Sequence, residues 1–197
     1  MIRTMKSVNP IVAIAQLPMF WSRADNLAAM LSAIAASAAQ GAQIVVLSEL
    51  AITGFHREIG READSTELPS DISKVREAAS RHRVAVVFGS PTFEDGGQRP
   101  FNSHLHVDPD GGIQAVVSKR GLTSSEATFF SFIASAVRVT LAAMDWSAVV
   151  TVARDSGVYV PTSGRAIVFP FRHSCRTGNR VEPAILTSLH RSDKSKR

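Results

Sequence analysis

A short buried-strand pattern followed by a single carboxylate constrains this chain more than any other feature. Residues 44–47 read IVVL, and Glu49 follows them before Gly54 and Phe55. Aliphatic and β-branched runs of this length are typical of strands buried inside an α/β sheet. A carboxylate just beyond such a strand lies at the rim of the sheet, where α/β proteins build binding sites. The segment therefore predicts a buried strand that presents Glu49 to a site.

The surrounding sequence alternates strand and helix patterns. Two helical patterns separate the first three strands, one capped by Asp25 or Asn26 and one by Ser70 or Asp71. This order predicts parallel strands joined by right-handed crossovers, and the DPDGG sequence predicts a hairpin between the last two strands. The expected strands are residues 11–16, 44–47, 84–89, 101–107 and 113–117.

The positive charge of the chain is confined to its C-terminal end. Residues 172–197 contribute seven of the 22 Lys and Arg residues but only two of the 17 Asp and Glu residues. A neutral body argues against a nucleic-acid-binding surface on the fold. A polar, charged end is typical of a disordered tail, with a polyanion-binding arm as the less favoured interpretation. We therefore expect one domain over residues 1–171, a basic disordered tail over 172–197, and no nucleic-acid partner.

The number of cysteines and the lengths of the apolar runs indicate the cellular compartment in which the protein is expected. The single cysteine, Cys175, excludes an internal disulfide and fits a reducing environment. The apolar run near the start is broken by Gln16 and Pro18 and reads as a strand rather than a signal peptide. No run approaches the roughly 20 apolar residues of a membrane span. These features predict a cytoplasmic protein without a membrane partner.

A second charged segment follows the last expected strand. Lys119 ends that strand, and Glu126 lies seven residues further on, beside Phe129 and Phe130. A lysine at the mouth of a strand can stabilise an oxyanion in acyl transfer, and a semi-buried Glu49 can act as a general base. From the residues alone, a surface ion pair is an equally good interpretation of Glu49, and a routine strand-end lysine is the better interpretation of Lys119.

Several motifs together resemble the nitrilase, or carbon–nitrogen hydrolase, superfamily. IVVLSELAITGF, FGSPTFEDGG, FNSHLHVDPDGG and SKRGLTSSEATFF occur in the family's order, and the similarity runs over residues 10–132. The resemblance implies an α/β fold of the four-layer α-β-β-α sandwich type and an amidase-like member that uses a Glu-Lys-Cys triad. It implies Glu49 as the general base, Lys119 as the oxyanion stabiliser and Glu126 as a second glutamate. Asn102 and Phe55 would then be neighbours of the pocket.

The resemblance breaks down at the nucleophile. The best counterpart of the family's cysteine motif is VRVTLAAMDW, which places Ala143, Met144 and Asp145 on the cysteine-containing triplet. The following VARDSGVYVPTSG matches either the next helix end and strand or a later strand, and the second alternative implies that the cysteine segment is deleted. Either way we expect a fold that is incomplete at its C-terminal end and an activity that is weak or lost.

The other candidates for chemistry are weaker. Cys175 lies among basic residues but lacks a fixed base beside it. His104 and His106 share one face of a strand but lack a third metal ligand, and the DPDGG loop lacks the further oxygen ligands that calcium needs. We therefore expect neither a metal nor a cofactor.

Two functions of different classes remain open. The first is a carbon–nitrogen hydrolase acting on an amide- or nitrile-like molecule whose nucleophile, at Ala143, is replaced or deleted. The second is a non-catalytic descendant that binds such a molecule or pairs with a family relative. Because an incomplete sandwich exposes apolar faces and open sheet edges, we expect a homo-oligomer or a complex with such a relative.

Overall fold

The parallel strands predicted from the aliphatic runs form the centre of a seven-stranded sheet. The computed structural model describes residues 11–131 except 57, 95 and 120, and beyond them the backbone of five short strands. β1 (Ile11–Ala15), β2 (Ile44–Val46) and β3 (Ala85–Thr92) pair in parallel, and β4 (Phe101–Val107) and β5 (Ile113–Ser118) continue the sheet as antiparallel strands. All five strands predicted from the sequence are confirmed.

The remaining strands lie beyond residue 131. β9 (Arg165–Phe169) pairs in parallel with β1, and β10 (Ala184–Leu186) pairs antiparallel with β9, so the sheet order is β10-β9-β1-β2-β3-β4-β5. β6 (Val139–Ala143), β7 (Trp146–Val150) and β8 (Val158–Tyr159) form a separate three-stranded antiparallel sheet. β10 lies within the segment expected to be a disordered tail. The rest of that segment and the predicted boundary at residue 171 lie outside the described residues.

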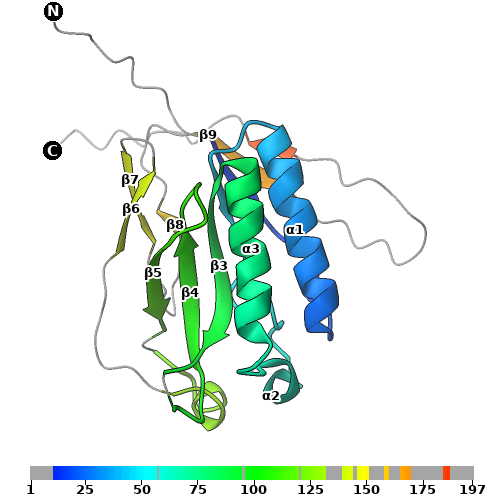
Figure 1. Cartoon of the computed structure of the whole chain (residues 1–197), viewed down its shortest axis with the longest axis vertical. Helices are drawn as coiled ribbons and strands as arrows, with labels where there is room; N and C mark the ends of the chain where they lie inside the picture. Colours follow the sequence, from blue (N-terminus) through cyan, green and yellow to red (C-terminus); the bar gives the residue numbers. More distant parts are fainter. Residues whose placement is uncertain are drawn as a thin grey trace, which may run out of the picture.

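Two helices pack side by side on one face of the large sheet. Figure 1 shows α1 (Arg23–Ala39) and α3 (Leu68–His82) in front of the parallel strands, with β4 and β5 to one side of them. Their inward faces are apolar at helical spacing, because residues three and four apart lie on the same side of a helix. The buried residues include Leu27, Met30, Ile34, Val75 and Ala79.

Both helices begin earlier than the capping residues in the sequence predict. Ser22 caps α1, with its Oγ accepting the Asp25 N–H at 3.4 Å, while the Asn26 side chain bonds both backbone groups of Phe20 at 2.8 and 3.0 Å. α3 begins at Leu68, two residues before Ser70. The predicted caps are therefore wrong, because the Asn26 side chain bonds the loop just before α1 and the Asp71 side chain bonds Arg23 instead.

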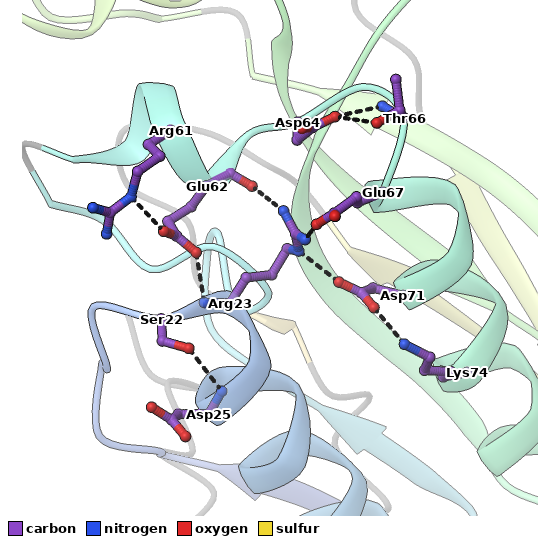
Figure 2. A network of polar contacts seen from close by, with 10 residues as sticks. All are labelled: Ser22, Arg23, Asp25, Arg61, Glu62, Asp64, Thr66, Glu67, Asp71 and Lys74. Carbon is purple, nitrogen blue, oxygen red and sulfur yellow. Dashed lines mark hydrogen bonds and ion pairs between the residues drawn. The ribbon is translucent and has the colours of Figure 1, made fainter.

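Figure 2 shows the contact between Asp71 and Arg23, an arginine whose hydrogen bonds connect the ends of three helices. Arg23 donates from Nε to Asp71 at 2.6 Å and from Nη1 to the Glu62 carbonyl at 3.0 Å, and it pairs with Glu67. Its backbone N–H donates to the Glu62 carboxylate at 2.8 Å. The opening turn of α1 is thereby joined to α3 and to α2 (Ile59–Glu62).

Candidate functional site

Glu49 lies on a tight turn at the carboxyl end of β2. Leu47 still bonds to β3, its N–H donating to the Val87 carbonyl at 2.8 Å, and the chain then turns away. Leu50 adopts a left-handed conformation with φ of 50°, which is uncommon for a residue with a side chain, and its carbonyl accepts the Gly54 N–H at 2.7 Å. The turn holds the Glu49 carboxylate at the rim of the parallel strands, as the sequence predicts.

A glycine on the neighbouring strand allows this turn to lie close to the sheet. A Cβ added at Gly89 of β3 would lie 2.6 Å from the carbonyl carbon of Glu49 and 2.7 Å from its Cα. The Gly89 N–H donates to the Ser48 carbonyl at 3.1 Å, and its carbonyl accepts the Ile52 N–H at 3.3 Å. Only a residue without a side chain fits here, because the two backbones are in direct contact.

Lys119 reaches the same place from the end of β5. Its backbone N–H donates to the Asn102 carbonyl at 2.7 Å, which extends the hairpin by one residue. Its Nζ donates to Glu49 Oε1 at 2.9 Å and to Glu126 Oε1 at 2.6 Å. The lysine side chain is 11% exposed, so its charge is compensated almost entirely by these two carboxylates.

Glu126 is oriented by the short helical turn η1 (Glu126–Thr128) that it begins. Its Oε2 accepts the Thr123 N–H at 2.8 Å, and the Thr123 Oγ1 accepts the Glu126 N–H at 3.2 Å. This reciprocal pairing is the arrangement of a capping box. The Glu126 side chain is 4% exposed, so one oxygen binds the loop and the other binds Lys119.

A small apolar cluster connects the two glutamate segments. Leu50, which follows Glu49, packs with Ile59 and with Phe130, and Phe129 contacts Phe130 edge to face with ring centres 4.9 Å apart. Burial of these side chains excludes water from one side of the charged group. The two carboxylates are thus held relative to each other by packing as well as through Lys119.

The pKa values of the buried charges favour their ionised forms. Burial acts to lower the pKa of Lys119, but hydrogen bonds to Glu126 and Glu49 outweigh it and raise that pKa above its usual value. Burial acts to raise the pKa of Glu126, but hydrogen bonds from Lys119 and Thr123 outweigh it and lower that pKa. At neutral pH Lys119 is therefore an ammonium and Glu126 a carboxylate.

A row of buried polar side chains continues from the site along one face of β4. Asn102 donates from Nδ2 to Glu49 Oε1 at 2.6 Å, and His104 and His106 follow on the same face at the period-two spacing of a strand. Burial lowers the pKa of His104, and it lowers the pKa of His106 to about 4, so both imidazoles are neutral at pH 7. Within the described part of the chain, no group of three or more His, Cys, Asp or Glu side chains could hold a metal ion.

The structure brings together most but not all of the residues singled out from the sequence. Glu49, Lys119, Glu126 and Asn102 form one hydrogen-bonded group. Phe55 is half exposed, and its backbone N–H bonds to Met19 Sδ at 2.8 Å rather than to this group.

Of the triplet predicted to hold the nucleophile, the structure describes only the backbone of Ala143. Ala143 is the last residue of β6, where its backbone pairs with Trp146 of β7. Its assignment to the nucleophile position stays a prediction. Met144, Asp145 and Cys175 lie outside the described residues.

Sequence reasoning missed the residues that support this group rather than carry its charge. The Thr123–Glu126 spacing is a capping-box pattern that was present in the sequence. No local pattern in the sequence could predict the roles of Gly89 and Leu50. Gly89 is needed because the backbone of Glu49 lies against it, and Leu50 packs against Phe130.

The family model described as carbon-nitrogen hydrolase matches residues 11–162 of this chain. This span includes Glu49, Lys119, Glu126 and Ala143. No curated protein matches the sequence.

Solved structures of an amidase from Nesterenkonia are similar in fold. An amidase from Nesterenkonia sp. superposes with a TM-score of 0.60 at 21% identity, covering 67% of this chain and 50% of that one. A glutamate-to-glutamine mutant of the amidase from strain AN1, with acrylamide added to the active-site cysteine, gives 0.62 at 19% identity over 70% and 54%. A cysteine-to-alanine mutant of that amidase in complex with butyramide gives 0.60 at 21% identity over 67% and 51%.

These similarities confirm the predicted fold class, an α/β fold of the nitrilase-like type. The described residues supply a seven-stranded sheet with two helices packed on one face, and a separate three-stranded sheet. The chain spans about half the length of these solved structures. Separately, no helix in the described part of the chain combines the length and the apolar character needed to cross a membrane.

Proposed function

The chain belongs to the carbon–nitrogen hydrolase family, and we propose that its Glu49–Lys119–Glu126 group binds an amide or nitrile while hydrolysis is weak or lost. The observation that carries this proposal is the ammonium of Lys119 held at 2.9 Å from Glu49 and 2.6 Å from Glu126. A base and a cation side by side at the rim of a sheet are the two charged elements that acyl transfer from an amide requires.

The exposure and the remaining hydrogen-bonding atoms of Glu49, Lys119 and Glu126 support a different role for each residue. Glu49 is 37% exposed and its Oε2 has no hydrogen-bond partner among the described residues, so this oxygen is available to take a proton. Lys119 has one N–H left after its two carboxylate bonds, and this can donate to a carbonyl oxygen that becomes negative. Glu126 is buried and holds the lysine in place.

The proposed loss of activity rests on Ala143. In a triad of this kind a thiolate attacks the amide carbon, the C–N bond breaks, and ammonia leaves with a proton delivered by the glutamic acid. Water then attacks the thioester and gives the carboxylic acid. A methyl group at position 143 can form no thioester. The remaining base and cation then act only on water, and removal of a nucleophile leaves a small residual rate in other hydrolases.

The alternative function is that of a non-catalytic descendant, which binds a small molecule or pairs with a family relative and hydrolyses nothing, and one comparison favours the binding role. A cysteine-to-alanine mutant of the Nesterenkonia amidase was solved in complex with butyramide. By extension, an alanine at the corresponding position need not prevent this chain from binding an amide. A non-catalytic descendant would use the same charged group to bind a small molecule or would serve as a subunit beside a family relative. Cytoplasmic localisation and oligomerisation remain predictions.

The decisive experiment measures ammonia release and butyramide binding with the same protein. We expect the wild type to bind butyramide in an NMR titration and to release little or no ammonia from it or from butyronitrile. Rapid ammonia release that Glu49→Gln abolishes and Cys175→Ser leaves unchanged would overturn the assignment of Ala143 as the disabling residue. Failure of the wild type to bind either compound would overturn the binding site itself.

Restoring the thiol tests the position assigned to the nucleophile. If residue 143 lies beside Glu49 and Lys119, Ala143→Cys should react with iodoacetamide faster than Cys175, because a nearby ammonium favours the thiolate. Lys119→Ala in the same background should slow that reaction. An unreactive thiol at position 143 in a folded protein would favour the alternative in which the cysteine segment is deleted.

A further inference from the structure

We propose that Asn102 is a positioning residue: it fixes Glu49 against Lys119 so that Oε2 of Glu49 remains the oxygen that faces a ligand. The ligand-binding part of this inference rests on the proposed function. Asn102 lies in the second position of β4, opposite Pro91 of β3, and is 1% exposed.

Among the described residues, Asn102 is the one that bonds both Glu49 and Lys119. Its side chain donates from Nδ2 to Glu49 Oε1 at 2.6 Å, and its backbone carbonyl accepts the Lys119 N–H at 2.7 Å. The lysine Nζ then bonds the same oxygen, Oε1, at 2.9 Å. Two donors from one strand pair therefore converge on one carboxylate oxygen.

Convergence on Oε1 determines the orientation of the whole carboxylate. A glutamate on a loop rotates readily about its terminal bond, and a single donor leaves the plane of its carboxylate free to turn. Two donors on one oxygen, together with the close backbone contact at Gly89, restrict that rotation. Oε2 is left without a described partner in a side chain that is 37% exposed. Such preorganisation is what a binding or catalytic group requires.

The cost of this asparagine to the fold supports a role beyond packing. Asparagine is disfavoured in strands, and the Asn102 Oδ1 is buried with no hydrogen-bond partner among the described residues. An unpaired buried carbonyl is destabilising. A leucine of similar size would avoid that cost, but it could not donate to Glu49. A neutral donor also orients the carboxylate without adding a second charge beside Lys119.

The test compares Asn102→Leu with Ser103→Ala. Ser103 is the next residue of β4 and is equally buried, and it bonds Thr92 at 2.6 Å and Ser118 at 2.8 Å on the opposite face. The control thus loses hydrogen bonds from the same strand without touching the site. Thermal melts of both variants report the general loss of stability, and Asn102→Ala replaces the leucine variant if that variant does not fold.

Two readouts separate positioning from packing. Hydrogen bonds to charged groups typically contribute about 1.5–3 kcal/mol, so Asn102→Leu should weaken butyramide binding by about 10- to 100-fold, and Ser103→Ala should leave it unchanged. In the ligand-free protein, the pKa of Lys119, measured by side-chain NMR, should fall in Asn102→Leu only. The physical reason is that a mobile Glu49 pairs less well with the ammonium.

The outcomes distinguish this inference from the proposed function. If the wild type fails to bind butyramide, the proposed function is wrong, and the pKa of Lys119 in the ligand-free protein still decides the role of Asn102. If Asn102→Leu leaves that pKa unchanged, or if Ser103→Ala lowers it equally, Asn102 only fills space and the inference is overturned.

Discussion

Arg23 and Lys119 each bond carboxylates that other elements supply, and the two networks differ in which carboxylate oxygens are left without a hydrogen-bond partner among the described residues. Arg23 joins the helix ends drawn in Figure 2, and both oxygens of its partners Glu62 and Asp71 are bonded, with Arg61 and Lys74 completing the set. Around Lys119, Glu126 has both oxygens bonded but Glu49 has one that no described residue bonds.

The difference separates a network that stabilises the fold from one that can bind a ligand. In the Arg23 network, both oxygens of Glu62 and both oxygens of Asp71 already accept hydrogen bonds from described residues. In the Lys119 network the two donors on Oε1 leave Oε2 exposed at the rim of the sheet. The Arg23 and Lys119 networks contain the same kinds of charged groups, but only in the Lys119 network do we propose a ligand site, at the oxygen of Glu49 that no described residue bonds.

The largest expected effect comes from Gly89→Ala, which acts on the backbone beneath the Lys119 network. Its new Cβ would overlap the backbone of Glu49, so we expect the free energy of unfolding to fall by more than about 3 kcal/mol, beyond the usual range for overpacking. Denaturant unfolding measures this loss. Gly121→Ala is the control, because no atom lies within 4 Å of a Cβ there and it should change stability little. Equal stability of the two variants would show that the turn at Glu49 can move aside.

Removing each cation compares the two networks directly. Lys119→Met leaves Glu126 buried without a cation, and we expect a loss of about 3 kcal/mol in unfolding free energy. Arg23→Met should cost about 1 kcal/mol, because Asp71 keeps Lys74 and Glu62 keeps Arg61. Chemical denaturation of both variants at neutral pH measures the two values. A larger loss for Arg23→Met would reverse the comparison.

Acid should weaken the Lys119 network through Glu126. Because the pKa of Glu126 is lowered in the folded state, its contribution is fully present above the ordinary value of 4.5 and is lost as the pH falls through the lowered value. Unfolding free energies of the wild type and Glu126→Gln, measured from pH 7 to pH 3, should therefore converge at the acid end. His104 and His106 titrate in both proteins, so the difference isolates Glu126. A difference that stays constant with pH would contradict this assignment.

The smallest expected change in stability is that of Glu49→Gln. Its side chain is 37% exposed and its pairing is screened by solvent, so we expect a change of about 0.5 kcal/mol or less. Butyramide binding should nevertheless weaken, because a neutral amide replaces the acceptor. A loss of stability as large as that of Lys119→Met would place Glu49 among the structural charges, like Asp71.

Much of the fold could be predicted because its signals are local. The runs IVAIA and IVV and the DPDGG turn contain enough information to identify strands and a hairpin, since hydrophobic periodicity and turn chemistry act within a few residues. The helix starts were misplaced where the side chain of the expected cap bonds a residue outside its own helix. Asn26 bonds the loop at Phe20, and Asp71 bonds Arg23.

The sequence by itself determined that Glu49 and Lys119 stand at the ends of strands, and resemblance in motif order suggested roles for these two residues and for Glu126. Only the tertiary structure decided which oxygen each donor takes. The convergence of Asn102 and Lys119 on Oε1, and the need for glycine at position 89, depend on contacts between segments 40 to 70 residues apart. Local patterns place a charge along the chain, but hydrogen bonds require atoms to meet in space, and chain packing decides which atoms do.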